Sequence, residues 1–186
     1  MDGVYHCLPG GWTVKKLSLA RRTSDTVWQL LDFQLNKYVG EWSFTVTLGV
    51  HDSCAAALLG WPSVNKEHPT IGVCQWRMRL SQLNRGTDEW IPLADNNVSN
   101  AICKDIAVPN GLEALDSMRD SAQIASLWES RPGSVWFQET NSLVLAALHF
   151  QGNEIAKAKQ IATRVLKTLE GGPSEAWVRR FLKRLT

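Results

Sequence analysis

The hydrophobic pattern along the first half of the chain alternates with a period of two, and this period predicts β-strands. The clearest example is segment 42–50, in which every second residue is large and apolar: Trp42, Phe44, Val46, Leu48 and Val50. Segments 12–20, 26–35 and 73–80 are also predicted strands. No helical pattern separates the first three, so we predict an antiparallel meander with one face exposed to water.

Segment 52–72 interrupts the alternation between the third and fourth predicted strands. It contains Trp61-Pro62 and His68-Pro69, and proline within a helix or strand removes a backbone donor. We therefore predict an irregular insert there.

The second half of the chain changes to helical periodicity, with apolar residues three or four positions apart. Ser121 and Ser174 are the predicted N-caps of two of the helices. The predicted helices cover residues 111–119, 122–130, 141–150, 154–169 and 175–185. A run of strands followed by a run of helices indicates an α+β fold, in which a meander within 1–93 packs against helices within 94–186. A length of 186 residues fits one domain, 1–186.

Composition adds one unusual feature, an excess of tryptophan. The chain has nine Trp against two Tyr and five Phe. Tryptophan fills cores and also anchors protein interfaces, where its indole N–H finds a partner. The excess therefore fits a protein that binds another protein.

Charge is distributed unevenly along the chain. Residues 1–156 carry twelve basic and sixteen acidic residues, whereas residues 157–186 carry eight basic and two acidic residues. Four of these basic residues lie in the last predicted helix: Arg179, Arg180, Lys183 and Arg184. They either complement the helix dipole in water or attract an acidic partner or nucleic acid. The first interpretation is the simpler one.

The cysteines give no sign of a metal site or of an oxidising compartment. Cys7, Cys54, Cys74 and Cys103 form no Cys-x-x-Cys pair, and none has histidine at zinc-finger spacing. The N-terminal residues lack the pattern of a signal peptide, and no apolar run is long enough to span a membrane. The sequence predicts a cytoplasmic protein with reduced thiols, and it predicts no metal, no cofactor and no membrane partner.

No established catalytic motif is present, and one local cluster gives the nearest approach to one. The segment GVHDSC places His51, Asp52 and Cys54 close together. His51 is the candidate acid/base if the protein is an enzyme. The simpler interpretation, which we favour, is a strand end that enters a loop.

A polar stripe on the last predicted strand is the strongest candidate for recognition. Gln75, Arg77 and Arg79 project to one side of the strand, with the two guanidinium groups about 7 Å apart. Such groups bind carboxylates or phosphates. Alternatively, Asp32 and Gln34 of a neighbouring strand complete an internal ladder with them, and the pattern favours this ladder.

Three passages together carry a resemblance to a known family. They are LDFQLNK at 31–37, FTVTLGVH at 44–51 and CQWRMRLSQLNRGTDEWIPL at 74–93. Their order resembles a bacterial domain-of-unknown-function family, number four-three-zero-four, over about residues 12–93. The resemblance implies a compact bacterial domain and supplies neither an activity nor catalytic residues.

Three hypotheses for function follow. The first is a non-enzymatic interaction protein, for example an immunity or antitoxin-like inhibitor, with Arg77, Arg79, Trp61 and Trp90 as the partner contacts. The second is a small enzyme or anionic-ligand-binding domain on the polar sheet face, and the third is nucleic-acid binding through the basic C-terminal helices. An enzyme predicts a concave pocket that joins His51 to the arginines, whereas a partner-binding protein predicts a flatter apolar patch with exposed tryptophan.

Overall fold

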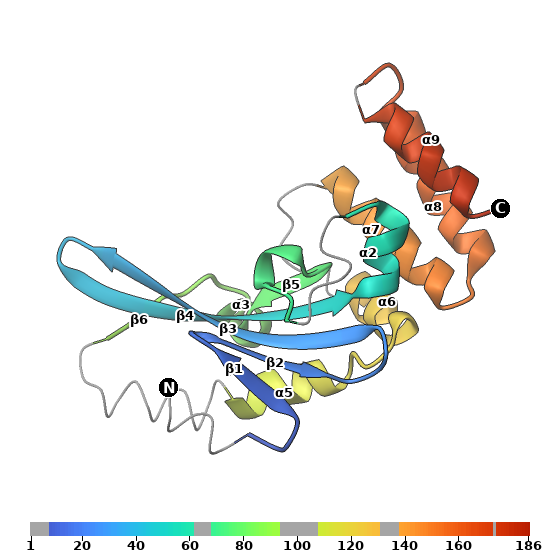
Figure 1. Cartoon of the computed structure of the whole chain (residues 1–186). Helices are drawn as coiled ribbons and strands as arrows, with labels where there is room; N and C mark the ends of the chain where they lie inside the picture. The colour runs from blue at the N-terminus through green and yellow to red at the C-terminus, as the bar shows by residue number, and fades with distance from the viewer. Residues whose placement is uncertain (1–7, 62–67, 94–107, 131–137, 173) are drawn as a thin grey trace.

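The protein has the predicted α+β fold. The computed structural model describes residues 8–61, 68–93, 108–130, 138–172 and 174–186. Six strands form one antiparallel sheet in the order β1-β2-β3-β4-β5, with β6 paired to β4 (Figure 1). The strands are β1 (Trp12–Lys15), β2 (Ser18–Arg22), β3 (Val27–Tyr38), β4 (Glu41–Asp52), β5 (Trp76–Arg79) and β6 (Ile91–Pro92).

The long hairpin of β3 and β4 forms the centre of the sheet. Twelve residue pairs join the two strands, from Val27 opposite Asp52 to Tyr38 opposite Glu41. The two loop residues, Val39 and Gly40, have φ angles of 49° and 88°, as a type I′ turn requires. A positive φ is strained for a β-branched residue such as valine. Figure 1 shows the tip of this hairpin projecting beyond β1 and β2.

One face of the sheet carries the main core. Its apolar residues alternate along the strands as predicted, and Leu31, Leu48 and Trp76 are fully buried. Helix α5 (Val108–Asp116) packs on this face. A Cβ atom at Gly111 would lie 3.0 Å from Cδ2 of Leu31 and 3.1 Å from Cδ2 of Leu48. Glycine therefore allows the helix backbone to approach the sheet closely.

The remaining helices continue this core beyond the end of β4 (Figure 1). Apolar stripes on α8 and α9 supply buried residues such as Ala158 and Phe181, whereas α7 is buried at most positions from 143 to 149, including Val144. The helices are α2 (Ser53–Leu59), α6 (Ser121–Ser130), α7 (Gln138–Gln151), α8 (Ile155–Thr168) and α9 (Glu175–Arg184). Among the described residues, none of the helices has the length and apolar character needed to cross a bilayer.

Contrary to the prediction from the sequence, neither Ser121 nor Ser174 caps its helix with a side-chain hydrogen bond. Asp120 precedes α6 and accepts a hydrogen bond from the backbone N–H of Gln123 at 2.8 Å. Ser121 is the first residue of that helix, and its hydroxyl donates to Asp52 instead. Ser174 occupies the N-cap position of α9, but its side chain makes no capping hydrogen bond.

The prediction of one water-exposed sheet face is wrong for β4. Residues 44–52 are buried throughout, including the alternate polar positions Thr45, Thr47 and His51. A second, small apolar cluster covers that face, and it includes Leu30, Cys74 and Ile71. A Cβ atom at Gly49 would lie 2.8 Å from Cys74 Sγ, so glycine in β4 leaves the space that this cover occupies.

Three predicted segments also differ in detail. The insert at 52–72 is not irregular throughout, because Ser53–Leu59 forms α2 after Asp52 caps it and Gly60 ends it with a φ of 71°. Segment 12–20 turns at Lys16-Leu17 into two strands, β1 and β2. Within segment 73–80 only Trp76–Arg79 is strand, between the short 3-10 helix η1 (Ile71–Val73) and helix α3 (Leu80–Arg85). Residues 62–67 of the insert lie outside the described residues.

Candidate functional site

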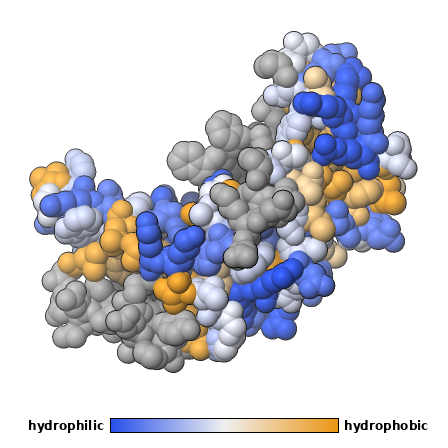
Figure 2. Space-filling model, viewed as in Figure 1, coloured by the Kyte–Doolittle hydropathy of each residue, from blue (hydrophilic) through white to orange (hydrophobic). Residues whose placement is uncertain are grey.

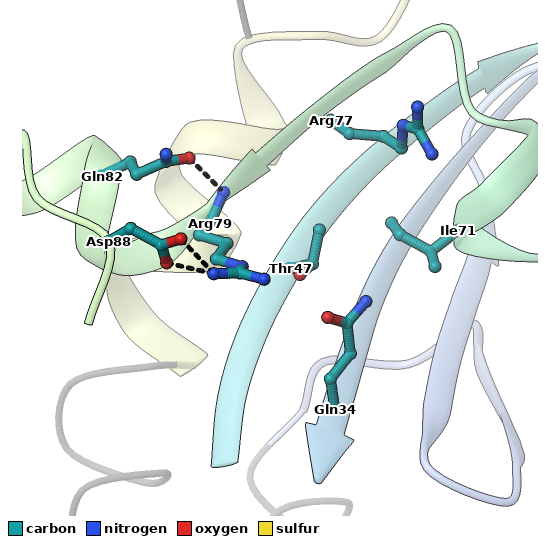
Figure 3. Close-up of a pocket in the computed structure, with 7 residues that line it drawn as sticks. All are labelled: Gln34, Thr47, Ile71, Arg77, Arg79, Gln82 and Asp88. Atoms are coloured by element: carbon teal, nitrogen blue, oxygen red, sulfur yellow. Dashed lines mark hydrogen bonds and ion pairs between the residues drawn. The ribbon is translucent and has the colours of Figure 1, made fainter. Parts of the chain in front are cut away.

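A small cavity on the second sheet face gathers the predicted arginines. Pairing of β5 with β4 places Arg77 opposite Gly49 and Arg79 opposite Thr47, so both arginines project from the same face. The cavity has a volume of about 180 Å³. Seven residues line it: Gln34, Thr47, Ile71, Arg77, Arg79, Gln82 and Asp88 (Figure 3).

Arg79 is fixed by its own neighbours. Its Nη1 donates to both carboxylate oxygens of Asp88, and its guanidinium lies 5.0 Å from the centroid of the Trp90 ring. The backbone N–H of Arg79 donates to Oε1 of Gln82 at 3.3 Å, which ties the strand to the first turn of α3. The charge of Arg79 is therefore balanced within the protein, and this residue forms a wall of the cavity.

Arg77 differs from Arg79 in this respect. No hydrogen bond or ion pair joins its guanidinium to another residue in the described part of the chain. Figure 3 shows its side chain turned away from Arg79 and Asp88. Burial raises the pKa of the nearby Cys74 thiol, and the positive charge of Arg77 opposes that rise. Arg77 thus supplies a cation whose hydrogen-bond donors are available to a ligand.

Thr47 adds a second unused polar group to the same cavity. The residue is only 7% exposed, and its hydroxyl has no hydrogen-bond partner among the described residues. A buried polar group without a partner costs about 1–3 kcal/mol. A ligand that brings a hydrogen-bonding atom to Thr47 would recover part of that cost.

The predicted ladder between the arginines and β3 does not form among the described residues. Asp32 and Gln34 do share the face of the arginines, but Gln34 donates to Asp32 at 3.3 Å and Arg79 pairs with Asp88. Burial raises the pKa of Asp32. Gln75 also leaves the stripe, because its amide binds the backbone N–H and carbonyl of Asp52 at 2.8 and 3.0 Å.

The size and composition of the cavity limit what it can hold. Its volume lies below the several hundred Å³ usual for pockets that enclose a whole small molecule or cofactor. A guanidinium and a hydroxyl suit a single carboxylate or a group of similar size and charge. No cluster of three metal-ligating side chains occurs among the residues that the structure describes.

His51 is separated from this cavity by burial. It is 2% exposed and is not among the residues that line the cavity. Its Nδ1 lies 3.1 Å from the carbonyl oxygen of Val73, to which that nitrogen donates in the neutral ring. Burial lowers the pKa of His51. The geometry therefore gives this histidine no access to a group bound by Arg77.

The buried His51 makes stability depend on pH. Its pKa in the folded protein is below the ordinary value of 6.5, so the unfolded chain binds a proton that the folded chain resists as the pH falls below 6.5. We expect stability to decrease from pH 7 to pH 5, and less steeply in His51→Gln, which keeps a donor for Val73. Urea unfolding at several pH values measures both slopes, and equal slopes would contradict this role.

The rest of the GVHDSC cluster has a structural role. The Asp52 carboxylate accepts hydrogen bonds from the backbone N–H groups of Cys54 at 2.9 Å and Ala55 at 3.1 Å, which caps α2. Burial and the charge of Asp52 raise the pKa of the Cys54 thiol, and a raised pKa opposes nucleophilic chemistry. The segment is a strand end that enters a helix rather than a loop. Cys7 and Cys103 lie outside the described residues.

The two predicted tryptophan contacts lie in different places. Trp90 stands beside the cavity because Arg79 stacks on it. Trp61 follows α2, where its backbone N–H donates to the carbonyl of Ala56 at 3.0 Å and its ring packs on the main core. Trp61 does not line the cavity.

Two side chains of α9, one of them from the predicted basic cluster, donate hydrogen bonds to the C-terminal end of α2. Nη1 of Arg184 donates to the carbonyls of Ala57 at 3.1 Å and Leu58 at 2.6 Å. The indole N–H of Trp177 donates to Leu59 at 2.9 Å. These donors satisfy carbonyls that a helix end leaves without partners. Arg179 pairs with Glu175 at 2.6 Å, whereas Arg180 and Lys183 are exposed.

Sequence reasoning did not identify four residues that line the cavity: Thr47, Ile71, Gln82 and Asp88. Thr47 carried a usable signal, since strand parity places it on the face of Arg77 and Arg79 once the pairing of β4 with β5 is assumed. Asp88 lies in the segment that follows α3. Its contact with Arg79 depends on how that segment folds back toward β5, and the hydrophobic pattern of the sequence does not predict this path.

Comparison with known proteins identifies a family for this chain. Neither the curated proteins nor the solved structures provide a significant match to this chain. The family model described as Domain of unknown function (DUF4304) matches residues 8–108, more than half of the chain. The match includes each strand that the structure describes and all residues that line the cavity. The chain therefore belongs to the DUF4304 family.

Proposed function

We propose that this protein is a non-catalytic binding protein that recognises an acidic group of a partner protein in the cavity of the second sheet face. The observation that carries the proposal is the guanidinium of Arg77, which lines the cavity without a carboxylate partner among the described residues. Arginine binds a carboxylate through two parallel hydrogen bonds. Thr47 lines the same cavity, and its hydroxyl has no hydrogen-bond partner among the described residues.

Two further features favour binding over catalysis. The buried His51 lies outside the cavity, so the candidate acid/base cannot reach a bound group. The walls of the cavity include Arg79 stacked on Trp90, and arginine and tryptophan are the residue types that most often anchor protein interfaces.

A bacterial cytoplasmic inhibitor of the immunity or antitoxin type is the form of this proposal that we favour. Such a protein acts by covering the surface of another protein, and it needs a specific anchor rather than catalytic groups. A toxin gene beside the gene for this protein would support that form. Capture of an acidic toxin would support it directly.

Replacing Arg77 with glutamine tests the proposal. We expect the tagged wild-type protein to capture a partner from cells of its source organism. The variant should capture it at least about tenfold less, because a hydrogen-bonded charge pair contributes about 1.5–3 kcal/mol. Quantitative mass spectrometry of the captured proteins measures the ratio.

The matched control is Arg180→Gln, which removes an exposed arginine from α9. It should capture as much partner as the wild type. Equal capture by Arg77→Gln and wild type would overturn the proposal. A small anion released on denaturing the wild type, and not on denaturing Arg77→Gln, would support the alternative of an anionic-ligand-binding domain.

A further inference from the structure

The outer half of β3 has one edge without a neighbouring strand in the described part of the chain. β2 pairs with β3 only as far as Ser18 opposite Asp32. The next hydrogen bond, from the N–H of Phe33 to the carbonyl of Leu17 at 2.9 Å, is the last one on that side within the part of the chain that the structure describes. Among the described residues, positions 34–38 of β3 pair with β4 alone.

The direction of the backbone groups on this edge follows from the same hydrogen bond. The N–H of Phe33 points toward β2, and backbone groups alternate in direction along a strand. The N–H and C=O groups of Leu35 and Lys37 therefore point away from β4. An open row of this kind is a template for another extended segment.

The tip of the hairpin exposes apolar side chains. Tyr38 is 77% exposed and Val39 is 84% exposed, while Leu35 and Trp42 are each 48% exposed. Figure 2 shows the apolar surface at the end of the molecule where Figure 1 places this tip. The register puts Leu35 and Trp42 on one face of the hairpin, with Lys37 stacked 5.3 Å from the Trp42 ring centroid. A segment added along the edge would contact Leu35.

The turn itself is built at a cost to stability. Val39 has a φ of 49°, a conformation that asparagine or glycine adopts with less strain. A strained and exposed apolar residue such as Val39 does not increase the stability of the fold. Strain of this kind is typical of sites that contact a partner.

Charge indicates the kind of segment that fits. Lys37 lies on the open edge, and the exposed Lys15 and Lys16 lie in and beside the β1–β2 turn, next to Leu17 where the edge begins. Lysine on an edge disfavours pairing with a second copy of the same chain, because like charges would meet. The same three lysines attract an acidic segment.

We infer that the outer half of β3 binds an extended, acidic segment of a partner protein as an added strand. The backbone groups of Leu35 and Lys37 hold the segment, and the three lysines select its charge. This surface is formed by β3 and the β1–β2 turn, whereas the cavity of Arg77 lies between β3, β4 and β5. The inference therefore does not depend on the proposed function of the cavity.

A fluorescein-labelled peptide that alternates glutamate and valine tests this inference. We expect micromolar binding, measured by fluorescence anisotropy at low salt. A peptide with lysine in place of glutamate, and a glutamate peptide with N-methylated backbone, should each bind roughly tenfold more weakly. Hydrogen exchange measured by NMR should show the Leu35 and Lys37 amides protected only when the glutamate peptide is bound.

Variants separate this surface from the rest of the protein. Lys37→Glu should weaken binding of the glutamate peptide several-fold, whereas Lys159→Glu on α8 should leave it unchanged. In Arg77→Gln the glutamate peptide should still protect the Leu35 and Lys37 amides, so failure of this inference and failure of the cavity proposal are distinguishable. Three results would overturn the inference: no binding of the glutamate peptide, equal binding of the lysine peptide, or self-association that protects the Leu35 amide without peptide.

Discussion

Replacing Gln29 with leucine is expected to lower the free energy of unfolding by about 3 kcal/mol. Gln29 is fully buried on the core face of β3. Its Nε2 donates to the carbonyls of Leu115 at 2.5 Å and Met118 at 2.9 Å, and its Oε1 accepts from Nε of Arg21 at 2.7 Å. One amide thus joins two strands to the end of α5. Leucine has a similar volume but leaves these interior groups without their partner.

Gln34→Leu is the matched control for this change. Gln34 lies on the same strand but is half-buried at the cavity, where it donates to Asp32 at 3.3 Å. We expect this variant to lose less than about 1 kcal/mol. Urea unfolding followed by circular dichroism measures both differences. Equal losses in the two variants would show that the amide of Gln29 is not what holds α5 to the sheet.

Asp52→Ala is expected to have an effect of similar size, about 3 kcal/mol. The buried carboxylate caps α2 through the N–H groups of Cys54 and Ala55, and it accepts the hydroxyl hydrogen of Ser121 at the start of α6. The end of β4 and the first turns of two helices therefore meet at one side chain. Alanine removes the cap and leaves the Ser121 hydroxyl without its partner.

A double-mutant cycle with Ser121→Ala isolates the link between the helices. Ser121→Ala alone should cost about 1 kcal/mol. In the Asp52→Ala background it should cost much less, because its partner is already absent. Thermal unfolding of the four proteins provides the comparison. Additive losses would mean that Asp52 stabilises α2 without coupling it to α6.

The sequence was sufficient to predict a run of strands followed by a run of helices, because their periodicities are local, but it did not reveal α2, α3, β6 or the break between β1 and β2. The alternation in segment 42–50 identified β4, and the helical spacing of the second half identified α5 to α9. The cover on the second sheet face was not predictable in this way. Ile71 and Cys74 reach β4 from more than twenty positions away. Gly49, an interruption in an otherwise bulky strand, was the one local sign of it.

The candidate site was predictable to a similar extent. Strand parity placed Arg77 and Arg79 on one face, and the structure brings both to the cavity. That Arg79 has a carboxylate partner could not be predicted from local sequence, because this partner, Asp88, lies beyond α3. Residue type and proximity made His51 a candidate acid/base, but its contact with the Val73 carbonyl depends on the path of the chain after α2.

The tryptophan excess also has a partly structural explanation. Among the described residues, four indole rings lie within 6 Å of a cation: Trp12 with Arg21, Trp28 with Arg22, Trp42 with Lys37 and Trp90 with Arg79. All four tryptophans lie in the first half of the chain. Such pairs contribute about 0.5–1 kcal/mol each at exposed sites. Composition alone indicated that the tryptophans fill the core or an interface. The contacts show that some of them also stack against the cationic side chains of arginine and lysine.

The strained turn between β3 and β4 has a consequence for how the sheet assembles. A hairpin usually zips from its loop, where closure costs least entropy, but here the loop requires a conformation that Val39 resists. The most buried pairs, from Val27 with Asp52 to Leu31 with Leu48, lie in the half of the ladder away from the loop. We expect nucleation at that interior end, with the outer pairs forming last and fraying first. The tip would then sample open states on its own while the core ladder stays closed.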